Sequence, residues 1–296
     1  MKRTEHIIND IRFSTNQERT NRFPDIRFNK LLNDAQEEIQ RVVYTSDNDS
    51  RFFSKESFID SVGDQESYDL PVDIYSSNAI NSVALLAGSS VQSNSYYTPI
   101  KIISEKERST QSGYIVQGDK ILISPIPSVS ASSGIRVNYI KKLPDISFRL
   151  GKVASIVGPL ITVSGFPSQD ILDYDDYICS VDREGVQQDS GLYVSSYNNT
   201  TGEITIDTGS TPIVNTAVND YIVIGKNATS HSELEDSLEP YLTLFVEKKI
   251  FYINSSKDIG NADIFTKEEK QDIIMLFSKI DTDVKYPAIV DGYLNH

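Results

Sequence analysis

A helix-type pattern of apolar and polar residues begins after Pro24-Asp25. Apolar side chains recur at steps of three and four residues, at Phe28, Leu31, Leu32, Ala35, Ile39, Val42 and Val43. The positions between them are polar: Asp34, Gln36, Glu37, Glu38 and Gln40. This spacing predicts an amphipathic helix of roughly 18 residues, ended by the polar run that starts at Thr45. Residues 1–24 have weaker periodicity and predict an arm or a short helix.

A second helical region follows residue 230. Ser232-Glu233-Leu234-Glu235 fits a capping box, which predicts a helix start, and Pro240 restarts or kinks that helix. The stripe that continues it consists of Leu242, Phe245, Val246, Ile250 and Ile253. A further helix is expected over about 262–281, with Ile273, Leu276, Phe277 and Ile280 on its apolar face.

Strand signals dominate between these helical regions, from about residue 51 to 226. Tyr114-Ile115-Val116 and Ile121-Leu122-Ile123 flank Gln117-Gly118-Asp119-Lys120, which predicts a hairpin. The segment 135–139 alternates between apolar and polar residues, as a half-buried strand does.

Residues 151–226 contain a weak internal repeat. Three short strand-like segments recur at offsets of 41, 43 and 44 residues: 153–156 with 194–197, 161–163 with 204–206, and 176–178 with 220–222. Such spacing favours a duplicated unit of three strands that cannot close a core alone. Chance similarity among short strand sequences is the alternative.

These elements predict an α+β fold in which the terminal helices pack as a small helical bundle, with a β-rich middle and an inserted antiparallel β-subdomain. The expected division is an N-terminal arm at 1–24, a helical bundle from 25–62 and 227–285, a β-rich region at 63–150, the inserted β-subdomain with its weak duplication at 151–226, and a C-terminal tail at 286–296.

Composition and charge narrow the function. The net charge of −14 disfavours wrapping of duplex DNA, because phosphate contacts need clustered basic side chains. Residues 1–30 nevertheless carry seven basic and four acidic side chains, whereas residues 150–226 carry three basic and ten acidic side chains.

The single cysteine, Cys179, excludes an intrachain disulfide and a multi-cysteine zinc site, and its apolar surroundings predict an inert thiol. The polar, charged residues 1–6 lead us to expect no signal peptide, and the sequence has no apolar run of 18 residues, so we expect no membrane span.

No catalytic motif stands out. A glycine-rich phosphate loop, HExxH and GxSxG are all absent. His6, His231 and His296 have no metal-type spacing partner, and Asp173, Asp175 and Asp176 lack the EF-hand pattern. We therefore expect no enzyme activity, no metal and no cofactor.

The ordered set of segments resembles the head-to-tail adaptor (connector) family of tailed bacteriophages. The segments are Leu31–Gln40, Glu66–Pro71, Gly118–Pro127, Val137–Tyr139 and the two C-terminal helices. The resemblance covers most of 25–145 and 231–281, and residues 146–226 look like an added module.

The resemblance implies a structural virion protein at the phage neck, assembled in the host cytoplasm. Its expected partners are copies of itself in a ring of roughly twelve, the portal protein, the next tail or neck protein, and passing DNA without sequence-specific binding; no membrane is involved. An acidic channel surface would repel DNA. Candidate portal contacts in the tail are Tyr286, Ile289, Val290 and Tyr293, and candidate protein contacts of the basic arm are Arg12, Arg19 and Arg22.

Two other functions remain open from sequence. A tail or baseplate protein would form trimers or hexamers instead of a larger ring. A carbohydrate-binding β-module or hydrolase would need a defined cleft with Tyr and Asp side chains. Binding or turnover of glycans would favour that second function.

Overall fold

The computed structural model describes residues 3–17, 25–46, 53–86, 97–165, 176–209, 211–234, 236–255 and 264–283. Helices lie towards both ends of the chain and antiparallel strands between them, so the protein is α+β, as the sequence predicts. The chain divides into two compact units. Unit 1 is Met1–Asn48 together with Pro144–His296, and unit 2 is Asp49–Leu143.

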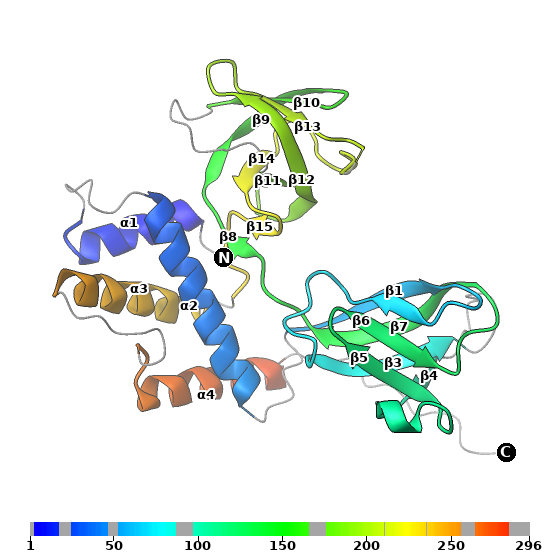
Figure 1. Cartoon of the computed structure of the whole chain (residues 1–296). Helices are drawn as coiled ribbons and strands as arrows, with labels where there is room; N and C mark the ends of the chain where they lie inside the picture. Colours follow the sequence, from blue (N-terminus) through cyan, green and yellow to red (C-terminus); the bar gives the residue numbers. More distant parts are fainter. Residues whose placement is uncertain are drawn as a thin grey trace. The chain divides into compact units, whose positions relative to one another are not determined.

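Helix α2 is the centre of a helical bundle in unit 1. It contacts α1, α3 and α4 and runs across all three in Figure 1. Gln36, Glu38 and Gln40 are buried, although the sequence pattern placed them on the polar side of the helix. That expectation was wrong because neighbours cover α2 on several sides. The helices are α1 (Thr4–Ser14), α2 (Asp25–Thr45), α3 (Glu239–Asn254) and α4 (Lys267–Asp283).

The sequence pattern defined two helix starts less sharply. Residues 4–14, for which the sequence left an arm or a short helix open, form helix α1, whose Ile7, Ile8 and Ile11 are buried. Helix α3 begins at Glu239 and not at the predicted capping box, because Pro240 takes a first-turn position that needs no amide hydrogen. Glu235 of that box lies outside the described residues.

Six strands of unit 1 close into a barrel, in the order β10-β13-β12-β11-β14-β9 (Figure 1). Ten buried residues, all of them Leu, Val or Ile, fill its interior. A short parallel pair, β8 (Asp145–Ile146) with β15 (Ala228–Thr229), joins the barrel's two ends to the rest of the unit. The barrel strands are β9 (Arg149–Val157), β10 (Leu160–Ser164), β11 (Tyr177–Val181), β12 (Gln187–Asn198), β13 (Glu203–Ile206) and β14 (Tyr221–Ile224).

The strand order of the barrel is unchanged when β9, β10 and β11 are exchanged with β12, β13 and β14. Hydrogen bonds repeat in the same way. Val163 N donates to Gly202 O at 2.7 Å and Ile206 N to Pro159 O at 2.8 Å. Val153 N donates to Asp220 O at 2.8 Å and Val194 N to Asp176 O at 3.0 Å. We therefore propose that the barrel consists of two equivalent three-stranded halves.

Unit 2 contains a four-stranded sheet of order β1-β7-β3-β4 and a three-stranded sheet of order β2-β6-β5. Their shared core includes Val83, Ile121, Val137 and Tyr139. The hairpin of β5 and β6 confirms the one predicted around residues 117–120. The elements are β1 (Ser54–Ser61), β2 (Ser67–Asp69), β3 (Ile80–Leu86), β4 (Tyr97–Ile100), the 3-10 helix η2 (Glu105–Glu107), β5 (Gly113–Gln117), β6 (Lys120–Ser124) and β7 (Ala131–Ile140).

Residues 54–61 are a strand of unit 2, whereas the sequence division placed them in the helical bundle. They pair with β7 from Ser54↔Ile140 to Ser61↔Ala131. In the sequence, only a polar run lies between α2 and this strand. That run does not indicate that the chain passes from unit 1 to unit 2 at this point.

Candidate functional site

Helix α2 holds the segment that connects the two β-rich parts of the chain. The side-chain amide of Asn33 donates to Ile146 O at 3.0 Å and accepts from Ile146 N at 2.6 Å. Gln36 Nε2 donates to Pro144 O at 2.8 Å. Asn33 thus satisfies the backbone N–H and C=O of buried Ile146, as a neighbouring strand would. In the sequence both side chains looked like ordinary polar positions of an amphipathic helix.

Replacing Asn33 by alanine is expected to lower the free energy of unfolding by about 2 kcal/mol, because two buried backbone groups lose their partners. Chemical denaturation of the full chain measures this change. The matched control is Glu37→Ala, at an exposed position of the same helix, where the change should stay within about 0.5 kcal/mol. Equal effects of the two substitutions would contradict the role given to Asn33.

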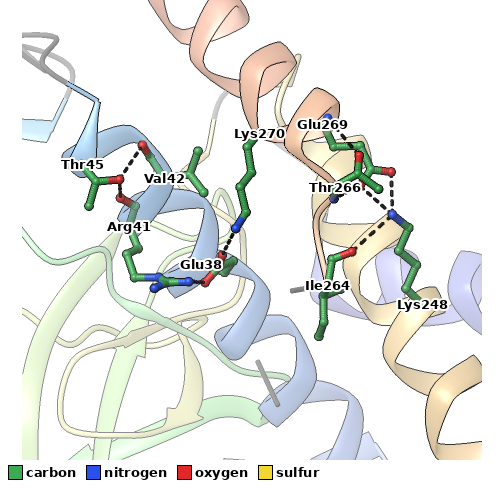
Figure 2. A network of polar contacts seen from close by, with 9 residues as sticks. All are labelled: Glu38, Arg41, Val42, Thr45, Lys248, Ile264, Thr266, Glu269 and Lys270. Carbon is green, nitrogen blue, oxygen red and sulfur yellow. Dashed lines mark hydrogen bonds and ion pairs between the residues drawn. The ribbon is translucent and has the colours of Figure 1, made fainter. Parts of the chain in front are cut away.

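Helix α4 is fixed at its start by a polar network shown in Figure 2. Thr266 N donates to Glu269 Oε2 at 2.7 Å and Glu269 N donates to Thr266 Oγ1 at 3.2 Å, which is a capping box. Lys248 Nζ, from α3, donates to both carboxylate oxygens of Glu269 at 2.6 Å and to Ile264 O at 3.3 Å. The sequence signal for this start was Thr266-Lys267-Glu268-Glu269.

Charge stabilises this network. Burial acts to raise the pKa of Glu269, but the hydrogen bonds from Lys248 and Thr266 outweigh it and hold the pKa below its ordinary value. The carboxylate is therefore ionised at neutral pH. It ties the first turn of α4 to α3, ahead of the segment that leads to the predicted tail.

A second carboxylate, Glu38, lies between α2 and α4 (Figure 2). Arg41 donates to its Oε2 from Nε at 2.9 Å and from Nη2 at 2.5 Å, and Lys270 Nζ lies 3.9 Å from its Oε1. The residue is 6% exposed, so two cations compensate a buried charge. A cavity of about 210 Å³ adjoins it, lined by Glu38, Arg41, Val42, Thr45, Ser46, Lys270 and Ile274.

The start of α1 is attached to the base of the barrel. Thr4 donates to Ser230 O from its backbone nitrogen at 3.1 Å and from Oγ1 at 2.9 Å. Arg149 lies with its guanidinium carbon 3.8 Å from the ring centre of Tyr221 and donates from Nη2 to Arg183 O at 2.8 Å. Through Thr4, the first helix is joined to Ser230, which comes 226 residues later in the chain.

His231 is buried in the same junction. Burial and the nearby charges of Arg149 and Arg3 lower the pKa of its imidazole below the ordinary value. The ring is therefore neutral at pH 7, and its Nδ1 lies 3.0 Å from Ser230 Oγ. This histidine is packed in the core of the junction. In the described residues, no group of three or more His, Cys, Asp or Glu side chains is placed to hold a metal ion.

The site residues expected from sequence fall in different places. Arg12 lies on α1, with its guanidinium carbon 5.2 Å from the ring centre of buried Phe28 on α2. It therefore contributes to packing inside the bundle, and an additional contact to another protein stays a prediction. The other candidates lie outside the described residues: Arg19, Arg22, Tyr286, Ile289, Val290 and Tyr293.

Cys179 is fully buried in the barrel. Burial raises the pKa of its thiol, and the sulfur accepts from Ala228 N at 3.3 Å. This side chain is packed as a small apolar residue.

Across the helices that the structure describes, none has the length and apolar composition needed to cross a membrane.

The chain was compared with known protein families and with curated proteins. The family model described as SU10 adaptor protein matches residues 4–167, which is more than half of the chain and runs from α1 through β10. Comparison with curated proteins gives no match.

Proposed function

The chain belongs to the SU10 adaptor protein family, a family of phage structural adaptors, and from this premise we propose that copies of it form a ring at the neck of the virion. The ring, of roughly twelve copies, links the portal to the next tail component. The protein acts by binding its neighbours and not as an enzyme. The observation that carries the proposal is the family match over residues 4–167.

The architecture of unit 1 suits this role. A ring subunit must present two different side faces and a face to each neighbouring ring. In unit 1 the bundle around α2 forms the base: α2 has a buried apolar side, Asn33 and Gln36 bond it to the segment at Pro144 and Ile146, and Lys248 links α3 to α4. The barrel leaves this base through the β8–β15 pair and returns through it, so it adds surface without interrupting the bundle.

The net charge of −14 supports a position along the DNA path. Like charges repel, so an acidic inner surface of the ring lets DNA pass without sticking to it. Contacts to phosphate would instead require clustered Lys and Arg, and the chain carries more acidic than basic side chains.

Image reconstruction of the phage neck tests the location. The α2-centred bundle and the six-stranded barrel should fit density between the portal and the tail. Density for these two parts at the baseplate, with none at the neck, would instead support the alternative of a tail or baseplate protein.

We also propose that the C-terminal tail contacts the portal through Tyr286, Ile289, Val290 and Tyr293. This segment has apolar side chains after a polar helix end. Deletion of residues 286–296 should weaken binding to isolated portal protein by about tenfold or more, because apolar anchors carry most of the free energy of such contacts. Surface-immobilised portal protein allows the affinity to be measured.

A matched control keeps the length of the tail. Ile289→Ser with Val290→Ser should reproduce most of the loss, whereas Asn295→Ser should leave binding as in the natural chain. Normal portal binding after deletion of residues 286–296 would reject the tail contact, while the family assignment would be unaffected.

A further inference from the structure

His231 lies where three segments of unit 1 meet. Its backbone forms an antiparallel bridge with Arg3, at the start of α1. The backbone of Gly185 lies directly against the ring, since a Cβ atom added to that glycine would be 2.0 Å from Nδ1. The third segment is the start of β9, whose Arg149 donates from Nε to Ser230 Oγ at 3.2 Å. The histidine is 6% exposed, so these neighbours enclose it.

The hydrogen bonds around the ring fit its neutral form. Ser230 Oγ lies 3.0 Å from Nδ1 of His231 and accepts from Arg149 Nε, so the hydroxyl hydrogen is left to donate to Nδ1. Nδ1 can accept this hydrogen only while it carries none of its own. Protonation of the ring therefore removes the bond and places a second donor against the same hydroxyl oxygen.

The charges near the ring also disfavour a cationic histidine. Arg149, Arg3 and the N-terminal amino group repel a positive ring, and Glu5 opposes them. Oε1 of Glu5 already accepts from Arg149 N at 3.3 Å. The loop that carries Gly185 adds three charged side chains that are exposed or only partly buried, and that water therefore screens: Asp182, Arg183 and Glu184. A further positive charge on the buried ring costs free energy, because the ring is out of water and is repelled by its neighbours.

We propose that protonation of His231 opens this junction and releases the start of α1 from the base of the barrel, so that unit 1 contains a pH-sensitive switch. The contacts that are lost include the two hydrogen bonds from Thr4 to Ser230 O, at 3.1 Å and 2.9 Å. The six-stranded barrel stays closed, because His231 is not part of its strands. Release of α1 needs no partner protein and does not depend on the proposed ring.

The direction of the effect follows from the protons that each state binds. In the open junction the imidazole titrates with its ordinary pKa of about 6.5, whereas burial and the nearby arginines hold the pKa of His231 lower in the closed junction. The open state therefore binds more protons. The closed junction keeps its full stability above about pH 6.5 and loses it as the pH falls below that value. Between pH 7.5 and pH 5.5 the ratio of open to closed chains should rise roughly five- to tenfold.

Hydrogen exchange of the full chain tests the switch. The protection factor of the Thr4 amide, corrected for the intrinsic exchange rate at each pH, should be roughly five- to tenfold lower at pH 5.5 than at pH 7.5. The Ile206 amide donates to Pro159 O within the barrel and reports on unfolding of the barrel itself. Its protection should change by less than about twofold. Equal protection of Thr4 at the two pH values overturns the proposal.

Two matched variants assign the effect to His231. His231→Asn keeps an acceptor near the position of Nδ1 and takes up no proton in this pH range, so the protection of Thr4 should be the same at both pH values. His6→Gln changes an exposed histidine of α1 and should retain the pH dependence of the natural chain. The same pH dependence in His231→Asn as in the natural chain overturns the proposal.

Nuclear magnetic resonance of the natural chain gives an answer even if His231→Asn does not fold. The imidazole ¹⁵N signals come from three histidines, and substitution of His6 and of His296 identifies theirs. At pH 7.5 the remaining signals should show a neutral His231 ring with its hydrogen on Nε2. As the pH falls, the protonated ring should appear only together with the loss of Thr4 protection. A protonated His231 in a chain whose Thr4 amide is still fully protected overturns the proposal.

Discussion

Replacing Gly185 by alanine should destabilise unit 1 by about 3 kcal/mol, since it combines backbone strain with a clash in a closed core. Gly185 has a φ of +90°, and a Cβ atom added to it would lie 2.0 Å from Nδ1 of buried His231. Neither side can move easily, because Gly185 O accepts from Thr229 Oγ1 at 2.6 Å and the histidine ring contacts Ser230. Denaturant titration of the full chain measures the loss.

Gly158→Ala is the matched control for this substitution. Gly158 also has a positive φ, +58°, but among the described residues no heavy atom lies within 4 Å of the place where a Cβ atom would stand. It should lose only about 1 kcal/mol, the cost of the backbone conformation. If both glycine variants lost the same free energy, the contact between the barrel and His231 would not be the tight junction described above.

Replacing Asp189 by alanine should destabilise the barrel by about 3 kcal/mol, because three backbone N–H groups and the Thr216 hydroxyl lose a charged acceptor. Asp189 is 8% exposed and accepts from Val214 N at 3.1 Å, Asn215 N at 3.0 Å and Thr216 N at 2.7 Å. Thr216 Oγ1 donates to the same carboxylate at 2.5 Å. Asp189→Asn keeps the shape and one acceptor, so it should lose roughly half as much. Equal stability of all three proteins would contradict the role of this carboxylate.

The Asp189 effect should depend on pH. Burial alone would raise its pKa, but the hydrogen bonds from Thr216, Asn215 and Val214 outweigh burial and hold the pKa below its ordinary value. A carboxyl group whose pKa is lower in the folded state stabilises the fold above the unfolded-state pKa of about 3.9, and this contribution is lost as the pH falls through the folded-state value. The difference between the natural chain and Asp189→Asn should therefore be full at pH 7 and shrink below about pH 4.

The sequence predicted elements well where local periodicity determines them. The helix from Pro24-Asp25 and the hairpin around residues 117–120 both form as expected. The offsets of 41, 43 and 44 residues in the barrel reappear as equivalent hydrogen bonds between strands, such as those of Val163 and Ile206. Local patterns carry this information because each repeat preserves its own strand spacing.

Other features depend on contacts between distant residues, and local patterns do not show them. Gln36 and Glu38 look solvent-facing in the sequence, yet both are buried. Gln36 donates a hydrogen bond to Pro144 O, and Glu38 lies near Lys270 of α4. Closure of the barrel likewise requires β9 to pair with both β10 and β14. The strand at residues 54–61 was assigned to the bundle for the same reason, since its partner β7 follows some 70 residues later.

For the candidate site, the sequence predicted the class of protein but not the contacts. The resemblance to phage adaptors indicated a structural protein before any contact was known, and the family match agrees with that class. Arg12 was expected to contact another protein, which stays a prediction; the contact with Phe28 inside the bundle was not foreseen. A basic side chain on a helix next to an aromatic residue of another helix gives no signal in sequence, because the two are brought together only by packing.

Native mass measurement of the full chain, with and without portal protein, tests whether the protein assembles on the portal. We expect a single chain or small species alone and a ring of roughly twelve copies once portal protein is added. Trimers or hexamers that form without portal protein, together with no binding to it, would contradict assembly on the portal and would place the protein elsewhere in the virion.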